Sequence, residues 1–98
     1  MSEYKTLFEC VRPAFICNLH AERAEDQCIL KLTLQSDSQH IVLFGFEGLT
    51  DSVSDLLSAE RIVISEELNT CREFGTIRIE CWVDEVYSEY WCDRANTE

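Results

Sequence analysis

Residues 41–46, Ile-Val-Leu-Phe-Gly-Phe, form the longest apolar run in the chain. Alternate residues of a strand point to opposite faces, so Val42, Phe44 and Phe46 would share one face. The residues between them are apolar or glycine, which is typical of a strand covered on both sides. The run is too short to cross a bilayer, which needs about 20 apolar residues. Its β-branched and aromatic content favours a strand over a buried helix. We therefore predict that this run is the central strand of one small domain.

Alternating apolar residues predict more strands around it. Residues 28–35 alternate cleanly and should form a hairpin with the central strand, through a turn at 36–39. Further along, 61–65 reads as a strand. Residues 76–83 read as another, with Ile77, Ile79, Cys81 and Val83 on one side. A turn at Asp84-Glu85 then leads into a strand over 86–92.

The N-terminal segment supports two interpretations. Tyr4, Leu7, Phe8 and Val11 have helical spacing, and Pro13 would end such a helix. An extended arm leading into an edge strand also fits, because proline is tolerated there. Residues 15–19 alternate like a strand, and the polar stretch 21–27 predicts a turn.

Residues 48–59 are the least decided stretch. Leu49, Val53 and Leu56 fit one face of a short helix, with Ser52 and Asp55 as a capping pair. An irregular strand crossing is the alternative, since Ser, Thr and Asp compete for backbone hydrogen bonds. We expect a turn or loop at 66–70 and a frayed tail after Asp93.

These segments predict one domain over residues 1–98, of the α+β class and mostly β. Five or six strands would form a mainly antiparallel sheet, because short turns join strands that are neighbours in sequence. One or two short helices complete the predicted fold.

The charge balance restricts the partners. Eight Lys and Arg against nineteen Asp and Glu give a net charge of −11. The basic residues are scattered singly, which argues against nucleic acid and against an anionic membrane surface. The acidity favours association with a basic protein partner, although solubility alone would also explain it.

Six cysteines raise the question of a disulfide scaffold. The first residues lack the basic and apolar regions of a signal peptide, so we expect reduced thiols in a cytoplasmic protein. Cys28, Cys81 and Cys92 sit on strand-like patterns, where cysteine packs as a small hydrophobe. Arg72 beside Cys71 is the best setting for a reactive thiol.

Motifs for catalysis and cofactors are missing. The sequence has no phosphate-binding glycine loop and no Cys-x-x-Cys or His-x-x-x-His pair, and His20 and His40 read as surface residues at strand ends. We therefore predict no metal, no cofactor and no enzymatic activity.

Residues 80–93 stand out as a binding surface. They contain both tryptophans and two of the three tyrosines, interleaved with five acids. In strands, Glu80 would share a face with Trp82, and Glu85 would share one with Tyr87. Aromatic side chains dominate protein–protein hot spots, and carboxylates attract Arg or Lys. The predicted partner-binding residues are Glu80, Trp82, Asp84, Glu85, Tyr87, Glu89 and Trp91. The alternative is that the rings cap the core while the acids keep the sheet edge soluble.

The chain resembles the small acidic immunity proteins of bacterial polymorphic and contact-dependent toxin systems. The resemblance lies in the strand 41–46 followed by Glu47-Gly48-Leu49, the C-terminal Glu89-Tyr90-Trp91-Cys92, and the small acidic chain. It implies a non-enzymatic inhibitor that docks on a basic toxin, often a nuclease. Two other hypotheses are a small-molecule-binding or cysteine-dependent catalytic domain, and a homodimeric structural or regulatory subunit that pairs through an edge strand.

Overall fold

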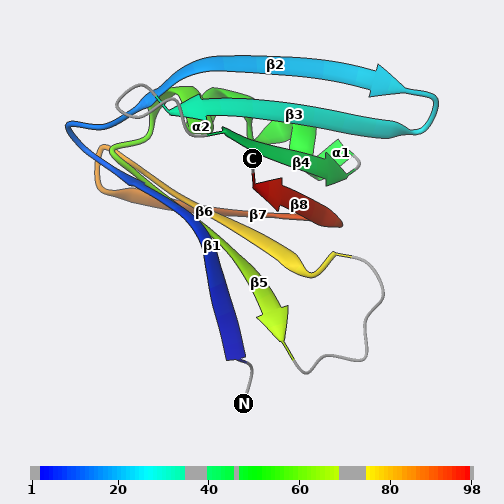
Figure 1. Ribbon diagram of the computed structural model, residues 1–98. Coiled ribbons are helices and arrows are strands. Elements are labelled where there is room, and N and C mark those ends of the chain that lie inside the picture. The colour runs from blue at the N-terminus through cyan, green and yellow to red at the C-terminus, as the bar shows by residue number, and fades with distance from the viewer. Residues whose placement is uncertain (1–2, 35–39, 46, 69–74, 98) are drawn as a thin grey trace.

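The chain folds into two antiparallel four-stranded sheets that lie as layers (Figure 1). The computed structural model describes residues 3–34, 40–45, 47–68 and 75–97. Sheet A contains, in spatial order, β1 (Glu3–Val11), β5 (Arg61–Leu68), β6 (Ile77–Val83) and β7 (Val86–Cys92). Sheet B contains β2 (Ile16–Ala24), β3 (Gln27–Leu34), β4 (His40–Gly45) and β8 (Arg94–Thr97). Two short helices, α1 (Glu47–Asp51) and α2 (Val53–Ser58), connect β4 to β5.

This architecture confirms the mostly β, antiparallel α+β class. The predicted number of strands is wrong, because the described residues form eight strands in two sheets. The additional strands are β1, where a helix was one interpretation, and β8, where a frayed tail was expected, and both lie at sheet edges. Pairing with neighbouring strands holds these segments extended, although their own sequence pattern does not indicate a strand.

The apolar run forms β4, an interior strand of sheet B between β3 and β8. Ile41 and Leu43 are fully buried, whereas Val42 and Phe44 on the opposite face are half-buried. The strand and its hairpin with β3 are confirmed. Phe46 and the predicted turn at 36–39 lie outside the described residues. One face of β4 therefore lines the core, and the other is only partly covered.

The N-terminal segment is the edge strand β1, so its interpretation as a helix is wrong. A bulge between Thr6 and Phe8 shifts the register against β5. The extra residue reverses which face later side chains use. Phe8 and Cys10 consequently turn into the core, while Tyr4 and Val11 stay exposed. The bulge thus interrupts strict alternation, and the apolar residues with helical spacing are divided between the two faces of β1.

Two polar segments predicted as turns belong to strands. β2 continues to Ala24, and only Glu25 and Asp26 form the turn into β3. β5 continues through residues 66–68, because Glu67 pairs with Tyr4 and Glu66 with Ile77. The rest of the predicted loop, 69–70, together with Cys71 and Arg72, lies outside the described residues. Hydrogen bonds to neighbouring strands outweigh the low β-propensity of these residues.

The helical interpretation of residues 48–59 is confirmed, but the predicted capping pair is wrong. The Ser52 side chain makes no capping hydrogen bond, and its Oγ instead donates to the Leu49 carbonyl at 2.6 Å. Asp55 accepts a 2.5 Å hydrogen bond from the Tyr90 hydroxyl of β7. This bond is the main reason why the pKa of Tyr90 is raised to about 12. It ties α2 to sheet A, while Leu56 enters the core.

The two sheets are joined at a corner where β7 runs into β8, so the expected frayed tail is wrong. The Asp93 amide donates to the Phe44 carbonyl at 2.8 Å, and its Oδ1 accepts from the Gly75 amide at 2.9 Å. Gly45 lies against this corner: a Cβ added there would come within 2.9 Å of the Cβ of Cys92. The close approach requires glycine.

The core between the sheets is mainly aliphatic. Its largest fully buried side chains are leucines and isoleucines from both sheets, with Cys81 and Cys92. Among the described aromatic side chains, only Phe8 is buried. Of the aromatic residues of β6 and β7, Tyr90 packs against this core, whereas Trp82, Tyr87 and Trp91 do not.

Candidate protein-binding surface

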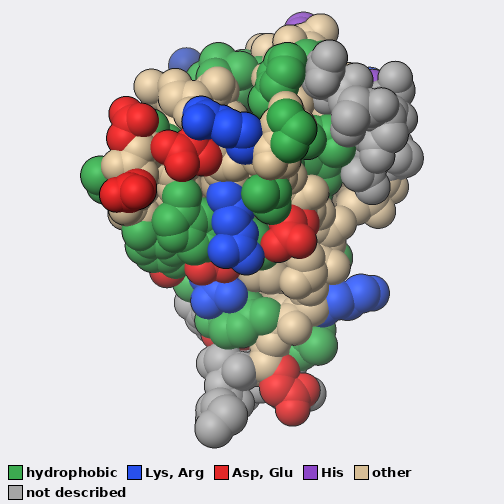
Figure 2. Space-filling model, turned by 90° about the vertical axis from the view of Figure 1, so that its left-hand side faces the viewer, with side chains coloured by type: hydrophobic (Ala, Val, Ile, Leu, Met, Phe, Trp, Pro, Cys, Tyr) green, Lys and Arg blue, Asp and Glu red, His purple; other side chains and the backbone are tan. Residues whose placement is uncertain are grey.

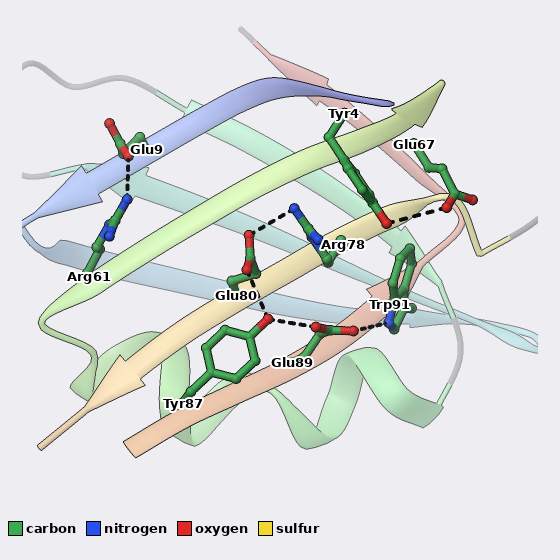
Figure 3. A network of polar contacts seen from close by, with 9 residues as sticks. All are labelled: Tyr4, Glu9, Arg61, Glu67, Arg78, Glu80, Tyr87, Glu89 and Trp91. Atoms are coloured by element: carbon green, nitrogen blue, oxygen red, sulfur yellow. Dashed lines mark hydrogen bonds and ion pairs between the residues drawn. The ribbon is translucent and has the colours of Figure 1, made fainter. Parts of the chain in front are cut away.

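The outer face of sheet A, which faces away from the core, gathers most of the predicted binding residues (Figure 3). In the register between β6 and β7, Trp82 lies opposite Tyr87 and Glu80 lies opposite Glu89. Trp91 lies opposite Arg78 on the same face. Five of the seven predicted residues thus come together on this face. We call it, with the β6–β7 turn, the docking face.

The rings on this face are held in fixed positions. The ring centroids of Trp82 and Tyr87 are 5.1 Å apart, with their planes tilted by 59°. The guanidinium carbon of Arg61 lies 4.8 Å from the Trp82 ring centroid, a distance that suits a cation–π interaction. Tyr87 is 44% exposed, and the tryptophans are half-buried. The aromatic surface is therefore accessible and already ordered.

Two carboxylates on facing strands, those of Glu80 and Glu89, are surrounded by hydrogen-bond donors. Directly opposed like charges destabilise a sheet. The Tyr87 hydroxyl lies 2.9 Å from Glu80 Oε2 and 2.6 Å from Glu89 Oε2, and its single proton can serve one of them at a time. Trp91 Nε1 donates to Glu89 at 2.9 Å, and Arg78 forms an ion pair with Glu80 at 3.2 Å. The network offsets the repulsion and orients the rings.

These contacts also change the proton affinities of the network. The hydrogen bond from Tyr87 is the main reason why the pKa of Glu89 lies below its ordinary value, with Trp91 and Arg78 acting in the same direction. Desolvation and the two neighbouring carboxylates raise the pKa of Tyr87. At neutral pH the face therefore presents an ionised Glu89 beside a neutral Tyr87.

Basic side chains lie in the middle of this surface, which the sequence interpretation missed. Figure 2 shows Lys and Arg side chains in a central column, with hydrophobic and acidic side chains on both sides. Arg78 packs over the Tyr4 ring with its guanidinium carbon 3.7 Å from the centroid, and Arg61 pairs with Glu9 at 3.4 Å. Strand alternation from Glu80 could have found Arg78. Finding Tyr4, Glu9 and Arg61 required the pairing of β1 and β5.

Asp84 and Glu85 form the turn between β6 and β7, so the expectation that Glu85 shares a strand face with Tyr87 is wrong. Both turn residues have positive φ, 50° and 69°. A two-residue hairpin turn with two positive φ angles is of type I′, which favours Asn-Gly. Both side chains are exposed, and the Asp84 amide donates to Glu60 Oε1 at 2.9 Å. The turn therefore presents two carboxylates to solvent in an uncommon backbone conformation.

The five described cysteines differ in exposure. Cys10, Cys81 and Cys92 are buried, Cys28 is half-buried and Cys17 is exposed. Burial is the main cause that raises the pKa of Cys81 and of Cys92 to about 12. Both buried thiols are consequently protonated and shielded at neutral pH, which makes them poor nucleophiles.

The two histidines lie on sheet B. His20 is exposed within β2 rather than at its end, while His40 begins β4 and its Nδ1 lies 3.0 Å from Thr33 Oγ1. Within the described ranges, no three His, Cys, Asp or Glu side chains are grouped to hold a metal ion. No helix in the same ranges is long and apolar enough to span a membrane.

No protein-family model, curated protein or solved structure matches the chain.

Proposed function

We propose that this protein is a non-enzymatic binding protein of the immunity type, whose docking face neutralises a basic toxin domain. The aromatic side chains Trp82, Tyr87 and Trp91 supply the contact area. Asp84 and Glu85 steer the basic partner from the turn, and the network around Glu80 and Glu89 holds the rings in place.

The observation that carries this proposal is the location of the rings. A chain with an aliphatic core leaves two tryptophans and Tyr87 on the solvent side of sheet A. Tyr and Trp are enriched in binding hot spots, and rings ordered before binding lose less conformational entropy when a partner arrives. A surface that served only solubility would not need fixed aromatic side chains.

The turn adds a second argument. Positive φ costs non-glycine residues about 1 kcal/mol each or more, and such strain gathers at functional sites. The turn keeps two acids where Asn-Gly would be more stable. Attraction of a basic partner explains why acids occupy these two turn positions.

The test measures binding of a candidate partner, such as a basic nuclease toxin domain encoded beside this protein. We expect Asp84→Lys with Glu85→Lys to reduce the association rate by about tenfold at low salt, and less at high salt, because long-range attraction is screened. Trp82→Ala should mainly increase the dissociation rate.

The control reverses the same number of charges at the β2–β3 turn, with Glu25→Lys and Asp26→Lys. Figure 1 shows the β2–β3 and β6–β7 turns at opposite ends of the molecule. If both double variants slow association equally, the acidity acts diffusely and the docking face is misassigned.

A further inference from the structure

β2 is the most exposed edge strand in the part of the chain that the structure describes. Seven of its nine residues are exposed, and only β3 pairs with it. β8 has only four residues, and β7 borders the docking face. β1 carries Glu3, Lys5 and Glu9 and is interrupted by its bulge. Unpaired strand edges present a row of backbone donors and acceptors to other chains.

The sequence of β2 is complementary to itself in one antiparallel register. A two-fold axis through Ala21 places His20 of one copy opposite Glu22 of the other, twice. The same register sets Leu19 opposite Arg23. Moving the axis to Glu22 opposes two carboxylates, and moving it to His20 opposes two histidines. An imidazole N–H can donate to a carboxylate that faces it, and two facing carboxylates weaken pairing, so the axis at Ala21 is favoured.

The charge around β2 also suits a second copy. Pairing of β2, β3, β4 and β8 places thirteen described side chains on the outer face of sheet B. They are Asn18, His20, Glu22, Ala24, Gln27, Ile29, Lys31, Thr33, His40, Val42, Phe44, Arg94 and Asn96. This set holds one acid and two permanent cations, in a chain of net charge −11. Two such acidic chains repel least where their least acidic surfaces meet.

We propose that two copies of this chain pair through β2, antiparallel about Ala21, to form a continuous eight-stranded sheet. The outer face of sheet A belongs to the other layer, so each dimer presents two docking faces. The proposal does not depend on the proposed function, because it concerns self-association alone.

A disulfide trap tests the register. In a Cys17→Ser background, Ala21→Cys places two thiols directly opposite each other. Facing residues have Cα atoms about 4.5–5.5 Å apart, which suits a disulfide. Ala24→Cys is the control on the same strand. Its two thiols would lie about 20 Å apart, at roughly 3.3 Å per residue. We expect mild oxidation to cross-link Ala21→Cys and not Ala24→Cys. Equal cross-linking of the two variants would overturn the proposal. Cross-linking of neither variant would also overturn it, and a different chain would then be the partner for the edge of β2.

Charge exchange tests the same contact without cross-linking. Light scattering over a range of concentrations should show the mass of the wild type rising from 11.4 kDa towards twice that value. Glu22→Lys or His20→Glu alone should weaken self-association about tenfold, because symmetry counts each exposed pair twice. The double variant carries both substitutions, so each pair joins a carboxylate at position 20 to a Lys at position 22, and dimerisation should return. A wild type that stays monomeric, or a double variant no better than the single variants, contradicts the pairing.

Discussion

At the scale of single residues, the Tyr87 hydroxyl links the two opposed carboxylates of the docking face. We expect Tyr87→Phe to lower the free energy of unfolding at pH 7 by about 0.5–1 kcal/mol, since the bond is exposed. It should also raise the pKa of Glu89 towards its ordinary value of 4.5. Urea unfolding and an NMR titration measure the two effects. Tyr4→Phe removes a hydroxyl with a longer 3.4 Å bond to Glu67 and should change less.

The same change predicts a different pH profile. A carboxyl with a depressed folded-state pKa stabilises the fold above its unfolded pKa, and this stability is lost as pH falls through the folded pKa. Below pH 4.5, the wild type should therefore lose the contribution of Glu89, whereas Tyr87→Phe has less of it to lose. The stability difference between the two proteins should narrow in acid. A difference that widens there would show that Tyr87 does not hold Glu89 ionised.

At the scale of elements, one change in the β6–β7 hairpin should affect stability and binding in opposite directions. Asp84→Asn with Glu85→Gly installs the residues that a type I′ turn favours, and we expect the free energy of unfolding to rise by about 1 kcal/mol. The same variant should bind a basic partner more weakly, because two steering charges are gone. Chemical denaturation and binding kinetics on one preparation measure both. Increased stability with unchanged binding would remove the turn from the docking face.

At the corner between the sheets, we expect a substitution of Gly45 to lower stability rather than raise it. Alanine there would crowd Cys92, whose Cβ lies 2.9 Å from the added methyl position. Overpacking of this kind costs typically about 1–3 kcal/mol. Thermal unfolding of Gly45→Ala measures the loss. Gly75→Ala is a useful contrast, because nothing lies within 4 Å there and its cost comes from φ of +68° alone.

At the scale of the whole molecule, the net charge of −11 should make stability depend on salt. Repulsion among carboxylates weakens as the Debye length falls to about 8 Å near physiological ionic strength. We expect Tm to rise with added NaCl. Neutralising the four acids of the β2–β3 and β6–β7 turns, with amide or glycine replacements, should reduce that dependence. A Tm that is insensitive to salt in the wild type would mean that ion pairs already balance the repulsion.

Much of this architecture could be predicted from sequence, and the rest depends on pairing over long distances. Alternation located β3 and β6 because one face of each strand is buried, and the continuous apolar run located β4. It failed for β8, whose Arg94–Thr97 carries no apolar pattern and is ordered by β4. In β1, the bulge at Leu7 interrupts the alternation that would have indicated a strand.

The residues of the candidate site also divide into those that local alternation could predict and those that depend on distant pairing. Glu80, Trp82, Tyr87, Glu89 and Trp91 could be grouped from local alternation, because β6 and β7 are adjacent in the chain and in space. The arginine that stacks on Trp82 comes from β5, and the carboxylate that pairs with it comes from β1. No local pattern links these two positions, so the part of the mixed charge that they contribute could not be predicted.

The order of strands within the sheets affects how the chain reaches this structure. β1 pairs with β5 and β4 with β8, so each sheet joins segments from both halves of the sequence. Neither half can complete a sheet by itself, and closing such long loops slows the search for native contacts. We therefore expect refolding in milliseconds to seconds rather than microseconds, in one transition that forms both layers together.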